Sequence, residues 1–237
     1  MLFMIFPSNS PARSFPDNNS SDFTIPLFEN LLTPDTKNWR IGLMQIQIPM
    51  TYYNVEEDQV INVVTEGNVE EIHMPEGIYY SPQDICSAFN EISQTCTLSW
   101  ENTQTVIRFS NPVSEFSCSI SLARLLGIPT QILQPRQIFR SPTFTFDPWI
   151  NHKILFLHCS LVEKGYMNTE SYRLLQTFAP SKHRFGVTFS QSFNPVEFVP
   201  ILGKFHSAIN FRITDIENRP VRFRSGNVIL TIAFDHD

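Results

Sequence analysis

Three arginines near the end of the chain have the side chains and spacing for a binding role. The stretch FRITDIENRPVRFRSGNVILTIAF, residues 211–234, holds Arg219, Arg222 and Arg224 between two alternating apolar runs. Arg222 and Arg224 are two positions apart, so an extended backbone places them on one face. Guanidinium groups fit carboxylates well, so these arginines are candidate contacts to an acidic neighbouring subunit. A solvated corner between two strands explains the same residues, and both interpretations stay open.

The groups that could support catalysis are not arranged for it. His158 and Cys159 are adjacent on a predicted strand, which points their side chains to opposite faces and excludes a nucleophile–base pair between them. The carboxylates of VEED (55–58) and EE (70–71) follow predicted strand ends, which favours solvated loops over a metal or acid–base site. The phosphate-binding motifs and the G-x-S-x-G and H-E-x-x-H motifs are absent. We therefore expect no enzyme activity and no cofactor.

The metal-binding residue types are scattered along the chain. None of the four cysteines forms a C-x-x-C pair, so buried thiols in a reducing compartment are expected instead of a zinc site. An enzyme built on a metal-binding cupin sandwich would need clustered histidines, and the sequence does not cluster them. The six histidines are His73, His152, His158, His183, His206 and His236.

Charge and composition favour a folded protein without nucleic-acid binding. The net charge is −6, and the aromatic residues are not interleaved with lysine and arginine. The 21 phenylalanines and 17 prolines, against 8 glycines, indicate a β-rich core with ordered connections. The apolar start MLFMIF ends at Pro7, which is too short for a membrane span, and it needs cover from the protein's own core or from a partner.

Two helices and one irregular strand can be placed locally. Ser81, Pro82 and Asp84 predict the start of a helix over 81–92, and Gly127 predicts the end of another over 121–127. In the strand 38–49 the apolar residues change parity after Leu43, which indicates a β-bulge or a strand covered on both faces.

The remaining pattern predicts an all-β protein. Short strands separated by turn signals are typical of a sandwich, and about eight of them suit a jelly roll of two four-stranded antiparallel sheets. We expect an N-terminal arm over residues 1–20 and a single jelly-roll domain over 21–237, with a small α+β insertion at about 69–128. The later strands are expected at 143–147, 153–161, 171–178, 185–190, 195–199, 205–214 and 227–234.

Three ordered blocks resemble the minor capsid (penton) proteins of Polinton/Maverick elements and their adintovirus relatives. The first, residues 15–55, has the family's pattern at Trp39, Gly42, Leu43, Ile46, Pro49, Tyr53, Asn54 and Val55. The second comprises PEGIYYSPQDICSAFNEI (75–92) and LARLLGI (122–128), and the third runs from LFLHCSLVE to the closing FRITDIENRPVRFRSGNVILTIAF. Asn218 stands where the family usually has glycine, and Ala233 replaces its usual histidine.

The resemblance implies a structural protein of an icosahedral particle. Five copies would form a homopentamer at the five-fold vertex, among a separate double jelly-roll major capsid protein. The protein would be located in the virion after synthesis in the host cytoplasm, with assembly there or in the nucleus. It implies no small-molecule substrate, no membrane span and no direct nucleic-acid binding. A jelly-roll module that binds a glycan or receptor, using Trp100 and Trp149 near polar loops, is the alternative function.

Overall fold

A computed structural model shows two compact units, which we describe separately. The sandwich unit comprises Met1–Tyr52 and His152–Asp237, and the inserted unit comprises Tyr53–Asn151. The structure describes residues 1–9, 15–27, 38–56, 59–65, 68–111, 113–130, 138–167, 170–180, 186–201 and 207–236.

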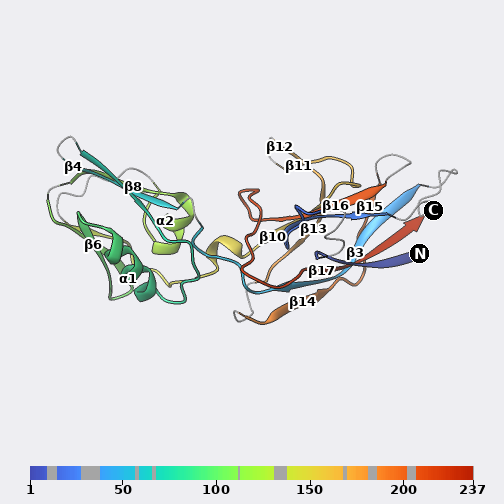
Figure 1. Cartoon of the computed structure of the whole chain (residues 1–237), viewed down its shortest axis with the longest axis horizontal. Helices are drawn as coiled ribbons and strands as arrows, with labels where there is room; N and C mark the ends of the chain where they lie inside the picture. Colours follow the sequence, from blue (N-terminus) through green and yellow to red (C-terminus); the bar gives the residue numbers. More distant parts are fainter. Residues whose placement is uncertain are drawn as a thin grey trace. The chain divides into compact units, whose positions relative to one another are not determined.

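The sandwich unit consists of two antiparallel sheets (Figure 1). The five-stranded sheet has the order β1-β17-β3-β14, with β15 also paired to β3. Its strands are β1 (Leu2–Pro7), β17 (Ile229–His236), β3 (Trp39–Pro49), β14 (Thr188–Ser192) and β15 (Phe198–Pro200). The four-stranded sheet has the order β13-β10-β16-β2. Its strands are β13 (Leu174–Phe178), β10 (Leu155–Cys159), β16 (Ala208–Thr214) and β2 (Asp22–Pro26). A further hairpin pairs β11 (Gly165–Met167) with β12 (Glu170–Tyr172).

The strand order is that of a jelly roll. β14 and β15 pair with different parts of β3 and act as two halves of one strand. With these two counted together, the first strand lies beside the last, the second beside the seventh, the third beside the sixth and the fourth beside the fifth. This is the pattern of an antiparallel ribbon rolled into two sheets. The predicted all-β jelly-roll sandwich is therefore confirmed.

The N-terminus differs from the expected arm. Leu2–Pro7 forms β1, which pairs along its whole length with β17, so Met4 lies opposite Ile232. The first strand of the jelly roll thus comes from residues expected to lie outside the domain. The cause is alternation within the apolar start: Phe6 is buried in the core, while Phe3 and Ile5 remain exposed.

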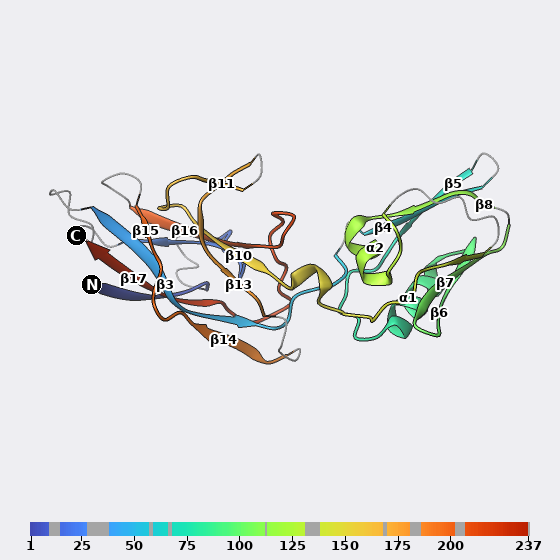
Figure 2. The ribbon, with the colours of Figure 1, turned by 180° about the vertical axis from the view of Figure 1, so that it is seen from behind.

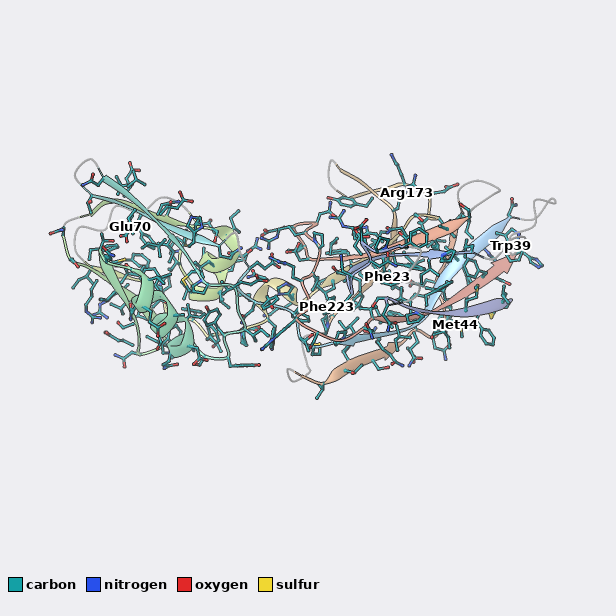
Figure 3. All side chains as sticks on the ribbon, viewed as in Figure 1. Phe23, Trp39, Met44, Glu70, Arg173 and Phe223 are labelled. Carbon is teal, nitrogen blue, oxygen red and sulfur yellow. The ribbon has the colours of Figure 1, made fainter. Side chains whose placement is uncertain are left out.

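Aromatic side chains from both sheets meet in the core of the sandwich. Phe211 of β16 lies 5.5 Å from Phe6 of β1 and 5.7 Å from Phe23 of β2, measured between ring centroids. Figure 3 shows Phe23 inside the sandwich and Arg173 at its outer side. Each such fully buried ring contributes about 1.5–3 kcal/mol to stability, so the phenylalanine-rich composition serves packing, as predicted.

The long strand β3 contains the predicted bulge. Thr231 of β17 pairs with Gln45, but the next residue, Ile232, pairs with Leu43, so Met44 is the extra residue. Before the bulge Leu43 is buried, and after it Ile46 is buried at the opposite parity. The bulge lets both halves of the strand face the same core.

The inserted unit has two small sheets and two helices (Figure 2). One sheet has the order β5-β4-β8, with β4 (Val60–Thr65), β5 (Asn68–His73) and β8 (Val113–Cys118). The other has the order β6-β7-β9, with β6 (Cys96–Glu101), β7 (Gln104–Phe109) and β9 (Ile138–Arg140). The structure gives this α+β unit wider bounds than the expected 69–128, because β4 and β9 pair within it. The strand expected at 143–147 is not formed.

Both predicted helices are present, with the expected ends. Helix α1 (Pro82–Ile92) begins with a capping box in which the Ser81 hydroxyl accepts from the Asp84 amide and the Asp84 carboxylate accepts from the Ser81 amide. Helix α2 (Ile120–Leu126) ends at Gly127, whose φ of +63° is left-handed. A Cβ at Gly127 would lie 2.3 Å from the Phe144 ring, so glycine is required here for space as well as conformation. A short 3-10 helix, η1, covers Ile150–His152.

Candidate subunit-contact site

The arginine-bearing corner starts where β16 ends. The buried Asp215 carboxylate accepts hydrogen bonds from the backbone amides of Glu217 (2.8 Å) and Arg219 (3.0 Å) through Oδ1. Asn218 has a φ of +61°, a left-handed conformation that asparagine tolerates better than most residues. The turn therefore has the conformation expected where asparagine replaces glycine.

Arg219 is directed into this turn. Its Nε and Nη2 both donate to Asp215 Oδ2, at 3.0 and 2.8 Å, and Nη2 lies 3.3 Å from Glu217 Oε2. The Arg219 side chain is 27% exposed, against 2% for Asp215. Much of its donor capacity is used within its own corner, so its main role is to neutralise a buried carboxylate.

Arg222 and Arg224 are presented outward on one face, as their spacing predicts. Val221 is buried and its amide donates to the Ile213 carbonyl at 3.1 Å, while Phe223 forms a β-bridge with Tyr52. The alternating residues Arg222 and Arg224 are exposed. The structure thus groups these two and separates Arg219 from them in role. Their contact with a neighbouring subunit remains a prediction.

The corner is fixed to the sandwich on the far side of the arginines. The Arg224 amide donates to the Thr51 carbonyl at 2.9 Å, and the Thr51 hydroxyl donates to the Ser225 carbonyl at 2.5 Å. Gly226 has a φ of +92°, and a Cβ there would lie 2.7 Å from Cβ of Pro49. The segment therefore presents its charges from a well-anchored backbone.

A buried histidine lies beneath the corner, and sequence reasoning gave it no role. The His152 ring lies 4.8 Å from the ring of Tyr52, centroid to centroid. Burial lowers the pKa of His152 to about 4; Arg219 lowers it further, and Asp215 opposes the shift. His152 is therefore neutral at pH 7. Only the fold brings it near Asp215 and Arg219, so no local motif could have indicated this.

The possible catalytic residues are separated as predicted. Cys159 faces the core, and burial raises the pKa of its thiol to about 12. His158 is half-buried on the other face, with Nε2 2.9 Å from the Thr214 hydroxyl. A thiol kept protonated and a histidine on the opposite face of the strand cannot act as a nucleophile and its base.

The other candidate chemical residues serve structure where they are described. Within the described ranges, no group of three or more His, Cys, Asp or Glu residues could hold a metal ion. Glu71 pairs with His73 at 3.3 Å, and Trp100 packs edge-on against Phe144 at 5.0 Å between centroids. The backbone amide of Trp149 donates to the Asp147 carboxylate at 2.9 Å. Glu57, Asp58, His183 and His206 lie outside the described residues.

No helix in the described part of the chain is both long and apolar enough to cross a membrane.

The strand order and sheet pairing define the class of this chain as an all-β jelly-roll protein. Among solved structures, the chain is similar to the mavirus penton protein, with a TM-score of 0.51 and 12% sequence identity. The similarity covers 100% of this chain and 99% of the penton protein chain. At this identity the comparison shows a shared fold. No protein-family model and no curated protein matches the sequence.

Proposed function

We propose that this chain is a non-enzymatic capsid protein, a penton that closes the five-fold vertices of an icosahedral particle. The observation that carries the proposal is the fold similarity to the mavirus penton protein over essentially the full length of both chains. A similarity limited to the sandwich would fit many jelly-roll proteins. Here it extends through the inserted unit as well.

The residues behind the family resemblance support the proposal because they hold structural positions. Gly42 lies on β3 where β15 crosses, and a Cβ there would lie 2.5 Å from Val196 Cγ1. Asn54 clamps the backbone of Tyr79, donating to its carbonyl at 2.8 Å and accepting from its amide at 2.9 Å. The first and second blocks of the resemblance are therefore joined by a hydrogen-bonded pair. Such residues maintain a scaffold, as the proposed role requires.

The surface offers two features suited to subunit contacts. Met1, Leu2, Phe3 and Ile5 belong to the exposed large apolar residues, with Phe3 64% and Ile5 67% exposed. They lie on β1, the end strand of its sheet as described, and such a strand can pair with another chain. The exposed Arg222 and Arg224 offer positive charge on a chain with a net charge of −6. A ring of identical subunits needs two different complementary surfaces, and these features can supply part of them.

The finer parts of the proposal follow from the sequence resemblance. They are a homopentamer, a double jelly-roll major capsid protein as the surrounding partner, and a Polinton/Maverick or adintovirus-like lineage. The protein would reside at the vertices of the virion after synthesis in the host cytoplasm, with assembly there or in the nucleus. It would need no cofactor, small-molecule substrate, membrane span or direct nucleic-acid contact.

The test is assembly. The purified chain should be examined by mass photometry and negative-stain electron microscopy, alone and after co-expression with the major capsid protein from the same genome. Five-fold rings, or density for this chain at the vertices of assembled particles, are the expected results. A chain that stays monomeric at all concentrations and is absent from purified particles would refute the proposal.

A further inference from the structure

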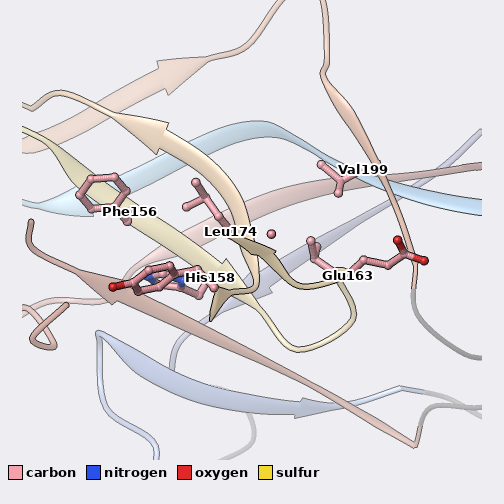
Figure 4. A pocket seen from close by; sticks show the side chains of 8 residues that line it. Phe156, His158, Glu163, Leu174 and Val199 are labelled. Carbon is pink, nitrogen blue, oxygen red and sulfur yellow. The ribbon is translucent and has the colours of Figure 1, made fainter. Parts of the chain in front are cut away.

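Two adjoining hollows lie on the outer face of the four-stranded sheet, away from the arginine corner's exposed stretch (Figure 4). The first has a volume of about 170 Å³ and mostly apolar walls. The second, of about 270 Å³, is polar. His158 and Tyr172 line both hollows, which makes them one continuous feature. The apolar walls are Phe156, Val162, Leu174 and Val199, and Glu163 also borders this hollow.

The sheet pairing explains why these side chains gather. On β10, Leu157 and Cys159 are buried in the core, so Phe156 and His158 face outward. Arg212 of β16 is the direct cross-strand partner of His158 and therefore lies beside it on the same face. The apolar and basic parts of the feature are thus held by neighbouring strands of a rigid sheet.

The polar hollow contains two arginines with donor capacity left over. Arg212 Nη2 makes one long contact of 3.5 Å with the Asn218 carbonyl, and its buried Nε has no acceptor in the described part of the chain. Arg173 Nη1 donates to the Ser160 carbonyl. Among the described residues, neither guanidinium forms an ion pair. Asp22 lies across the ladder from Arg212, but its Oδ1 accepts from Asn210 at 2.8 Å.

Two guanidinium groups without carboxylate partners favour an anionic ligand, because each offers five donors in a planar fork. The walls of the polar hollow also include Ser160, Asn210 and Asn218, whose groups can hydrogen-bond to peptide amides. The apolar hollow is similar in size to a cavity of about 150 Å³ that accommodates one benzene ring. It therefore fits one apolar side chain and is too small for a long acyl chain.

We propose that these two hollows bind an extended peptide segment of a partner chain that carries an apolar residue next to an acidic one. The apolar side chain enters the hollow lined by Phe156 and Leu174, and the carboxylate pairs with Arg212 and Arg173. That the partner is another capsid chain rests on the proposed function. Binding of such a peptide does not.

The test uses isothermal titration calorimetry of the full-length protein with matched synthetic peptides. The probe is acetyl-Gly-Ser-Phe-Glu-Ser-Gly-amide, and the controls replace its Glu by Gln or its Phe by Ala. We expect each replacement to weaken binding at least tenfold, because each removes one half of the recognition. Equal affinities for the Glu and Gln peptides would overturn the proposal.

Variants of the protein locate the site. Arg212→Met keeps most of the aliphatic stem and removes the charge, so it should weaken binding of the Glu peptide about tenfold and leave the Gln peptide unaffected. Arg224→Met, at the exposed stretch of the corner, should bind the Glu peptide as the parent does. Circular dichroism checks folding, and Arg173→Met serves as the second variant if Arg212→Met does not fold. Unchanged binding by the folded variant would refute the site.

Two further outcomes separate this inference from its alternatives. If decanoate binds and is lost with Arg212→Met while no peptide binds, the feature recognises a free amphiphile and the peptide proposal is wrong. If the chain assembles into five-fold rings but binds none of the peptides, the proposed function stands and this inference fails.

Discussion

Replacing Arg219 by methionine tests whether this arginine supports the corner from within. The change keeps an aliphatic side chain but leaves the buried Asp215 carboxylate without its guanidinium partner. Three contacts are lost, two with Asp215 at 3.0 and 2.8 Å and one with Glu217 at 3.3 Å. The two backbone amides that donate to Asp215 remain.

The expected cost is about 2–3 kcal/mol. Breaking a fully buried ion pair costs about 3–5 kcal/mol, and Arg219 is partly exposed, so water compensates some of the loss. For a chain of this size, that lowers the melting temperature by roughly 5–10 °C. Arg224→Met is the matched control, because its side chain is exposed; it should change the free energy of unfolding by less than about 0.5 kcal/mol.

The assay is urea unfolding followed by circular dichroism, combined with hydrogen exchange, because the two compact units can unfold separately. Amides of β16 should lose protection in Arg219→Met, while those of α1 keep theirs. Burial is the main cause of the low pKa of His152 and Arg219 adds to it, so the variant should also raise that pKa in an NMR titration. Equal midpoints for Arg219→Met and Arg224→Met would refute the structural role of Arg219.

Three further predictions follow from described contacts. Gly127→Ala should destabilise the inserted unit by about 3 kcal/mol, and Gly186→Ala, also at positive φ but with open space around its Cβ, should cost only about 1–2 kcal/mol in thermal unfolding. The folded-state pKa of His152, about 4, lies below the unfolded value near 6.5, so folded protein binds fewer protons between these values. Stability should therefore fall by about 3 kcal/mol as pH drops from 6.5 to 4, and urea midpoints of His152→Phe should show a smaller decline. The paired reversal Arg222→Glu and Arg224→Glu should weaken ring formation in mass photometry without lowering the melting temperature; equal assembly would leave a solvated corner as the explanation.

Local features of the fold were predictable because their causes are local. The change of apolar parity after Leu43 indicated a bulge, and the bulge is found at Met44. Ser81 and Asp84 indicated a helix start, and they form the capping box. In each case the residues that determine the structure are within a few positions of one another.

Pairing between distant segments could not be predicted in the same way. The apolar pattern of residues 2–7 fits a strand, but nothing in it identifies β17 as its partner. The inserted unit is wider than expected because Ile107 of β7 pairs with Phe139 of β9, across an intervening helix. Likewise, the spacing of the arginines indicated which of them share a face, but not that Arg219 turns toward a buried carboxylate.

The adjacency of β1 and β17 determines when the sandwich can be completed during synthesis. Met4 must wait for Ile232 to be translated, which takes roughly 10–50 s at ordinary elongation rates. The strands of Tyr53–Asn151 pair with one another and are available much earlier. A ribosome-bound chain therefore carries a finished inserted unit and an open sandwich. Because the jelly roll closes only when β17 emerges, truncated chains lack the finished scaffold and are excluded from assembly.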